Sequence, residues 1–200
     1  MSVPKVMSAI VLAAGRSERF GRDKRLEPID GLPMFLHTAL ALKRLVPDTL
    51  VVLGSADAVL RRMAEDRGLD ATCCPDAALG MGHSLAHAVA QRAEALGWLI
   101  MPADMPFVGA GTLRQVVAAA GSHSRAAPVF RGRRGHPVWF SRQYLDALCS
   151  LGGDQGARAL LQEPAAGADG SPEPVCLLPV DDPGCVHDVD RPADLAGVAG

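Results

Sequence analysis

Residues 6–15 read Val-Met-Ser-Ala-Ile-Val-Leu-Ala-Ala-Gly, a short apolar run that ends in small residues. The part from Val6 to Ala13 is rich enough in aliphatic side chains to be a strand buried on both faces. The polar segment Arg-Ser-Glu-Arg-Phe-Gly follows it directly, at residues 16–21. A buried strand that runs into a polar loop predicts a parallel sheet, with this loop at the edge where such sheets bind their ligands.

The segments that follow alternate between strand and helix patterns. Apolar residues recur at helical spacing after Pro33, which predicts a helix ending near Pro47. We further expect strands at residues 49–54, 70–73, 98–101, 127–130 and 137–140, and helices at 57–67, 83–95, 113–120 and 143–148. This alternation predicts a single α/β domain over residues 1–200, Rossmann-like and three-layered (α/β/α), with a mostly parallel twisted sheet. Residues 164–174, dense in glycine and proline, predict a flexible loop rather than a folded element.

Composition restricts the partners. The formal net charge of −2 gives no general attraction to nucleic acid, so we expect no nucleic-acid partner, and any phosphorylated ligand must be held by a local basic cluster. No segment approaches the apolar length of a membrane span and no cleavable leader is visible, so we expect no membrane association and a cytoplasmic location. The five cysteines are odd in number and scattered, which argues against a disulfide framework.

The loop after the first strand has the composition of a triphosphate site. Small residues let backbone N–H groups approach phosphates, and the cations Arg16, Arg19, Lys24 and Arg25 can neutralise them. The spacing of Gly15 and Gly21 fits neither a Walker A loop nor G-x-G-x-x-G. A solvated basic loop is the plain alternative. The predicted nucleotide-binding residues here are Leu12, Ala13, Ala14, Gly15, Arg16, Ser17, Arg19 and Lys24.

Two acidic turns are candidates for a metal site. Asp104 follows a predicted strand and stands between Pro102 and Pro106, which fix its backbone direction. Mg²⁺ uses one or two protein carboxylates and completes its octahedron with waters and phosphates, so a second acid should converge on the first. The segment Asp-Val-Asp at residues 188–190 is the best candidate, although either acid alone is compatible with a turn or a cap. Gly-Met-Gly-His-Ser at residues 80–84 opens a helix whose free N–H groups suit a base, ribose or phosphate.

Taken in order, these segments resemble the molybdopterin nucleotidyltransferases, and within them the cytidylyltransferase branch. The leading motif, Leu-Ala-Ala-Gly-Arg-Ser-Glu-Arg-Phe-Gly-Arg-Asp-Lys at residues 12–24, is its most specific part. Residues 80–85, 104–106, 134–138, 153–158 and 188–195 follow in the family's order. The resemblance implies a fold like that of the nucleotide-diphospho-sugar transferases, and it extends over nearly the whole chain.

The resemblance also implies roles for individual residues. Arg19 and Lys24 would hold the triphosphate and act in catalysis with Asp104, while Asp104 and Asp190 would bind Mg²⁺ as cofactor. The base and ribose would lie against Gly80, Met81, Gly82 and Ser84, and the pterin against Arg134, His136, Asp154 and Arg158. The guanylyltransferase branch carries glycine at the position of Ala14, which favours CTP here.

The expected reaction is therefore transfer of CMP from CTP to the phosphate of molybdopterin or molybdenum cofactor, with release of pyrophosphate. A molybdenum hydroxylase is a possible partner. Two alternatives stay open: an NAD(P)-dependent oxidoreductase on the same fold, and a non-catalytic chaperone that inserts the cofactor into such a hydroxylase. The first lacks its dinucleotide fingerprint. The second would bind the pterin without releasing pyrophosphate from CTP.

Overall fold

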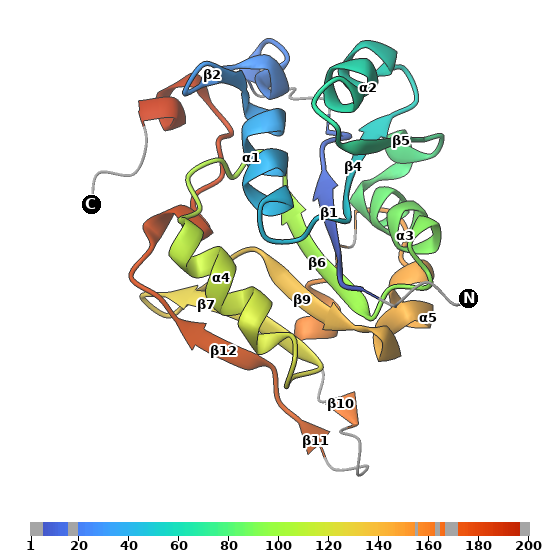
Figure 1. The fold of residues 1–200 in the computed structure, drawn as a ribbon, viewed down its shortest axis with the longest axis vertical. Helices are drawn as coiled ribbons and strands as arrows, with labels where there is room; N and C mark the ends of the chain where they lie inside the picture. The colour runs from blue at the N-terminus through green and yellow to red at the C-terminus, as the bar shows by residue number, and fades with distance from the viewer. Residues whose placement is uncertain (1–5, 16–19, 155, 163–164, 167–171, 197–200) are drawn as a thin grey trace.

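The computed structural model describes residues 6–15, 20–154, 156–162, 165–166 and 172–196. Its centre is a sheet in the order β12-β7-β9-β6-β1-β4-β5, with β8 paired to β7 (Figure 1). The strands are β1 (Ser8–Leu12), β4 (Thr49–Gly54), β5 (Asp70–Cys74), β6 (Gly97–Pro102), β7 (Arg125–Phe130), β8 (Arg133–Arg134), β9 (Val138–Ser141) and β12 (Cys176–Pro179).

The first strand lies in the middle of a parallel block. β1 pairs in parallel with β4 on one side and β6 on the other, and β5 extends the block beyond β4. Ile10 faces Leu50 and Ile100 across these ladders. On the far side of β6 the direction changes, because β9 is antiparallel to both β6 and β7. The edge pair β7 and β12 is parallel again, so the prediction of a mostly parallel sheet is confirmed.

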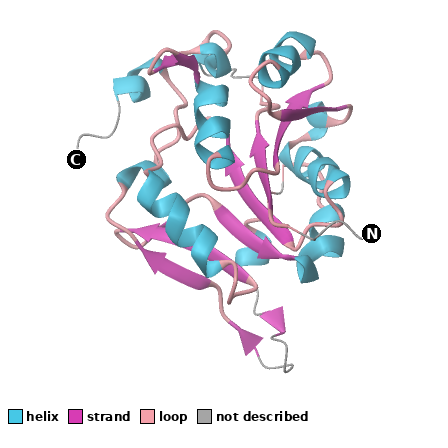
Figure 2. Ribbon diagram, in the orientation of Figure 1, coloured by secondary structure: helices cyan, strands magenta, loops and turns pink. Residues whose placement is uncertain are grey.

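Helices cover both faces of this sheet (Figure 2). They are α1 (Met34–Lys43), α2 (Ala58–Glu65), α3 (Met81–Gln91), α4 (Ala110–Ala119) and α5 (Leu145–Cys149). Successive β-strand side chains point to opposite faces, so Val11 packs with α1, α2 and α4 while Ile10 packs with α3 and α5. Two hydrophobic cores therefore sandwich the sheet, and the predicted three-layer α/β/α fold is confirmed.

A third, smaller cluster ties the end of the chain to the loop after β1. Phe20, Ile29, Met34 and Val189 are all buried in it. Ile29 belongs to a short hairpin formed by β2 (Pro28–Ile29) and β3 (Leu32–Pro33), whose turn places Asp30 and Gly31 at positive φ. Burial of Val189 brings its neighbours, Asp188 and Asp190, beside the loop and the end of β6.

The structure differs from the sequence interpretation near the C-terminal end. Strand β12 was not predicted, because the run Val-Cys-Leu-Leu-Pro-Val at residues 175–180 is short and contains a proline, which only an edge strand tolerates. Within the stretch 164–174, interpreted as a loop, β10 (Ala165–Ala166) and β11 (Pro172–Glu173) form a short antiparallel pair. The side chain of the buried Arg125 contacts the backbone of β11, since its Nη2 donates to the Glu173 carbonyl at 2.6 Å.

None of the helices in the described ranges has the length and apolar character needed to cross a bilayer.

Candidate active site

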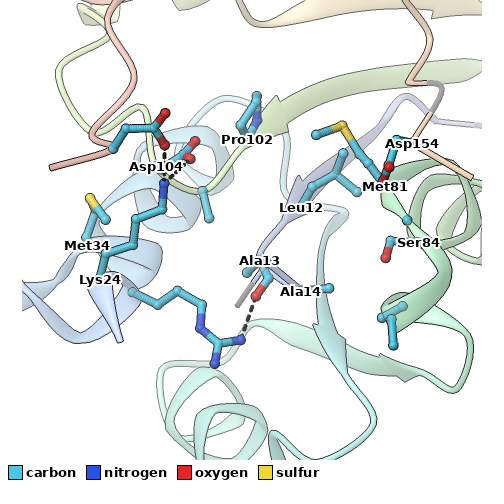
Figure 3. Close-up of a pocket in the computed structure, with 17 residues that line it drawn as sticks. Leu12, Ala13, Ala14, Lys24, Met34, Met81, Ser84, Pro102, Asp104 and Asp154 are labelled. Atoms are coloured by element: carbon cyan, nitrogen blue, oxygen red, sulfur yellow. Dashed lines mark hydrogen bonds and ion pairs between the residues drawn. The ribbon is translucent and has the colours of Figure 1, made fainter. Parts of the chain in front are cut away.

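A cavity of about 500 Å³ opens at the carboxyl ends of β1 and β6 (Figure 3). The sequence-predicted residues on its wall are Leu12, Ala13, Ala14, Gly15, Lys24, Gly80, Met81, Ser84, Asp104, Asp154 and Asp190. Gly82 is buried in α3 and is not part of the wall, whereas Arg16, Ser17 and Arg19 lie outside the described residues. The fold thus gathers segments from residue 12 to residue 190 around one cavity.

Lys24 joins the two predicted metal-binding acids at one side of the cavity (Figure 3). Its Nζ donates to Asp104 Oδ2 at 2.7 Å, to Asp190 Oδ1 at 3.0 Å and to the Val189 carbonyl at 2.8 Å. Burial alone lowers the pKa of Lys24, but the carboxylates of Asp104 and Asp190 outweigh this and raise it. Lys24 is therefore a cation held between two anions at neutral pH.

Backbone hydrogen bonds fix Asp104 in this position. The N–H of Ala103 donates to the Leu12 carbonyl at 2.9 Å, and Thr38 Oγ1 donates to the Ala103 carbonyl at 2.9 Å. The Asp104 carbonyl accepts a bond from the Val189 N–H at 2.8 Å. The carboxylate therefore stands on a turn tied to β1, to α1 and to the C-terminal segment.

A second carboxylate, Asp194, holds Asp190. Its Oδ2 accepts bonds from the N–H groups of Asp190 and Arg191, at 2.9 and 2.7 Å. This is a side-chain cap of the last 3₁₀ turn, η7 (Pro192–Ala196). The motif Asp-Val-Asp-Arg-Pro-Ala-Asp at residues 188–194 thus contains one cavity carboxylate and one residue that positions it.

The donor set fits a magnesium ion. Asp104 Oδ2 and Asp190 Oδ1 both lie within 3.0 Å of Lys24 Nζ, so these two hard oxygen atoms converge on a single point. Among the residues that the structure describes, no group of three or more histidine, cysteine or acidic side chains forms a cage. Two carboxylates with the remaining positions left to water and phosphate are the arrangement that Mg²⁺ accepts and that zinc cages lack.

Arg25, counted above among the phosphate-neutralising cations, lines the first cavity and is also paired within the protein. Its guanidinium donates to both carboxylate oxygens of Asp23 at 2.8 Å, to Asp57 Oδ1 at 2.9 Å and to the Ala13 carbonyl at 2.8 Å. Burial lowers the pKa of Arg25, but Asp23 and Asp57 outweigh this effect, so that its pKa is raised above the ordinary value. Arg25 thus clamps the loop and the end of β1 to the turn before α2. No local sequence signal indicates the pairing with Asp57, because Arg25 and Asp57 are 32 residues apart.

The opposite wall is the N-terminal end of α3, which holds Met81 and Ser84 (Figure 3). Gly80 has φ of +126°, and a Cβ there would lie 2.2 Å from the Gly153 carbonyl carbon. The N–H of Gly82 donates to the Gly153 carbonyl at 2.9 Å. Glycine at residue 80 is therefore required for packing against Gly153 and Asp154. One of the helix N–H groups expected to face the nucleotide bonds the protein instead.

A second cavity of about 660 Å³ adjoins the first. It contains all four residues predicted for the acceptor, Arg134, His136, Asp154 and Arg158, together with Arg133 from the basic turn at residues 131–136. Four residues belong to both walls: Leu12, Met81, Pro102 and Asp154. The two cavities therefore share a boundary at the end of β1, where groups bound in each would meet.

Electrostatics make the second cavity attractive to anions. Arg134 Nη1 donates to the Leu161 carbonyl at 3.0 Å, and its pKa is lowered first by burial and then by the nearby Arg158. Burial also lowers the pKa of His136 to about 4, which the carboxylate of Asp188 partly offsets and Arg134 reinforces. His136 is thus neutral at pH 7, while the two arginines remain charged and repel one another. An anion between them would relieve that repulsion.

Fold and site together define a class of enzyme. A loop of small residues at the carboxyl end of a central strand, a lysine with paired carboxylates and an adjoining cationic cavity are the parts needed to transfer a nucleotide between phosphates. The protein is a nucleotidyltransferase. It belongs to the family of the MobA-like NTP transferase domain, whose model matches residues 9–183.

Relatives of known sequence and structure agree. The chain is 31% identical over 198 residues to the purine catabolism protein PucB of Bacillus subtilis, with 92% of each chain covered. It is 32% identical over 118 residues to the molybdenum cofactor guanylyltransferase of Xanthomonas euvesicatoria, covering 59% of this chain and 57% of that protein.

Among solved structures, Rv0371c of Mycobacterium tuberculosis superposes with a TM-score of 0.80 at 31% identity, covering 98% of this chain and 97% of that one. A manganese complex of Rv0371c superposes with a TM-score of 0.75 at 30% identity, covering 96% and 97%. These comparisons confirm the predicted family and fold.

Proposed function

We propose that this nucleotidyltransferase uses Mg²⁺ to transfer CMP from CTP to the phosphate of molybdopterin or molybdenum cofactor in the cytoplasm, releasing pyrophosphate. The observation that carries the proposal is the pair of adjoining cavities. The first has a cation, two carboxylates and a small-residue loop, as a metal–triphosphate needs. The second is lined by Arg133, Arg134 and Arg158 and by apolar residues that include Leu85, Ile100 and Val138, as an anionic group on a flat heterocycle needs.

The chain's residues would divide the chemistry as follows. Asp104 and Asp190 would hold Mg²⁺, which when bound supplies positive charge to the phosphates. Lys24 and Arg19 would neutralise the triphosphate, and Arg134 with Arg158 would hold the acceptor phosphate. Because that phosphate is already an anion, its attack on the α-phosphorus needs no general base. Catalysis then rests on positioning and charge, and the neutral His136 can donate or accept a hydrogen bond.

The preference for CTP is inferred from Ala14, which lines the first cavity between Lys24 and α3 (Figure 3). Its methyl group narrows the space where the guanylyltransferase branch has glycine, and a pyrimidine needs less room than a purine. One methyl group is worth only ~1–3 kcal/mol in such discrimination. Groups near Gly80 to Ser84 are where hydrogen bonds to the cytosine edge would add to it.

We further propose that a molybdenum hydroxylase receives the product.

Pyrophosphate release tests the proposal directly. Each of the four ribonucleoside triphosphates is incubated with the protein and Mg²⁺, with and without molybdopterin, and the pterin product is identified by mass. We expect release that depends on CTP and molybdopterin together, with one CMP added per pterin. Tight NADPH binding without pyrophosphate release would favour the oxidoreductase. Pterin binding without release would favour the insertion chaperone.

A further inference from the structure

Lys24 occupies a position with the character of a cation site. Three oxygens surround its Nζ, from Asp104 at 2.7 Å, Val189 at 2.8 Å and Asp190 at 3.0 Å. Its side chain is only 12% exposed. The ammonium group therefore neutralises two carboxylates that would otherwise repel each other across a half-buried site.

A divalent ion needs the same oxygens. Mg²⁺ binds its ligands at about 2.0–2.1 Å, so an ion shared by Asp104 and Asp190 would take up the space that Nζ fills. The two cations would also repel each other strongly at that distance. Lysine and metal are thus alternative partners of one pair of carboxylates.

We propose that Lys24 is an exchangeable counter-ion of the metal site: the divalent ion enters by displacing its ammonium group, which then turns to the triphosphate. The inference rests on the proposed magnesium dependence and adds to it how metal binding is coupled to nucleotide binding. Metal binds weakly to the free protein, because it must break three contacts of a charged donor. It binds more tightly once a nucleotide offers Lys24 phosphate oxygens instead. Metal and nucleotide therefore load together.

Binding of Mn²⁺, followed through the paramagnetic resonance signal of the free ion, tests the exchange without any turnover. In the absence of nucleotide, Lys24→Met should bind Mn²⁺ at least about tenfold more tightly than the unsubstituted protein, because the competing charge is gone. Lys43→Met is the matched control, since Lys43 bonds the Gly68 carbonyl at the far end of α1 and should change nothing. Adding Asp104→Asn to Lys24→Met should abolish the gain.

Lys24→Gln provides a second variant of similar length without the charge, and thermal unfolding checks that both are folded. Mn²⁺ binding by both variants that is no tighter than in the unsubstituted protein would overturn the exchange. In a second arm, CTP should tighten Mn²⁺ binding by the unsubstituted protein more than by Lys24→Met. Equal tightening in both would contradict the exchange as well. The first arm uses neither nucleotide nor pterin, so it is decided separately from the choice of substrate.

Discussion

Asp104 is the residue on which the metal assignment depends most. Its turn is tied to β1, α1 and the C-terminal segment through backbone bonds that do not involve the carboxylate. Asp104→Asn should therefore keep the fold and reduce turnover by at least ~10³-fold, since a catalytic cation stabilises several kcal/mol of developing charge. Steady-state pyrophosphate release measures this. Asp30→Asn, in the exposed β2–β3 turn, is the control. Turnover of Asp104→Asn within a few fold of normal would remove Asp104 from the metal site.

Substitution of the neighbouring cations Lys24 and Arg25 should affect different properties, turnover for Lys24 and stability for Arg25. Lys24→Ala should lower the turnover number more than it raises the Michaelis constant for nucleotide, because its charge serves the transition state. Arg25→Ala should instead destabilise the protein by about 2–3 kcal/mol, because it leaves Asp23 and Asp57 without their partner. Urea unfolding and steady-state kinetics on both variants decide this. A stable Arg25→Ala protein that has lost turnover would show that Arg25 acts on the substrate.

His136 should make the stability of the folded protein depend on pH in the acid range. Its pKa is about 4 in the folded protein and near 6.5 when unfolded, so between these values only the unfolded chain takes up the proton. Stability from this residue is complete above pH 6.5 and is lost as pH falls toward 4, by at most about 3 kcal/mol. His136→Gln should flatten the fall in unfolding free energy between pH 6.5 and 4.5. An unchanged slope would show that His136 is charged in the folded state.

The sequence predicted individual residues where the signal was local. Asp104 could be found because prolines bracket it after a buried strand, and Lys24 because cations are dense after Gly15. The clamp formed by Arg25 could not, since a charged side chain carries no mark of which distant aspartate it will meet. The sequence interpretation therefore counted Arg25 among the cations that neutralise phosphates. In the structure, its N–H groups donate to Asp23, to Asp57 and to the Ala13 carbonyl.

At the scale of elements, the N-terminal end of α3 meets Gly153 and Asp154 at the boundary between the two cavities. Gly80→Ala should destabilise the protein by about 2–4 kcal/mol, because its Cβ would overlap the Gly153 backbone at a φ that alanine avoids. Gly111→Ala is the matched control: nothing lies within 4 Å of its Cβ position, and alanine inside α4 should stabilise by about 0.5–1 kcal/mol. Thermal unfolding compares them, and equal effects would contradict the close contact at Gly80.

Helices and strands were predictable where their sequences show a regular pattern of apolar residues. The central strands are continuous aliphatic runs and the helices show apolar spacing, so their positions follow from the chain. The helix predicted from residue 83 begins at Met81, because Gly80 supplies the positive φ that lets the chain turn into it. Strand β12 escaped notice because its stability comes from pairing with β7 at the sheet edge, which no local pattern records.

At the scale of the whole molecule, the site depends on where the sheet places its strand ends. β1 and β6 are neighbours in space but are 90 residues apart, and their register sets Leu12 beside Pro102. Alternation of strands and helices predicted this edge as the ligand site. The return of the C-terminal segment to the same edge was predicted from the need of Mg²⁺ for a second carboxylate and from the family resemblance, but its anchoring through Val189 in the small third core was not predicted.

The choice of nucleotide is the central claim, and competition tests it most directly. Equal concentrations of CTP and GTP are supplied with molybdopterin and Mg²⁺, and the masses of the dinucleotide products are compared. Ala14 lines the first cavity, and we expect its methyl group to disfavour the larger base, so we predict a cytidine product in ~5- to 150-fold excess, as ~1–3 kcal/mol implies. Ala14→Gly should narrow that ratio. Equal amounts of the two products, or an excess of the guanosine form, would contradict the account.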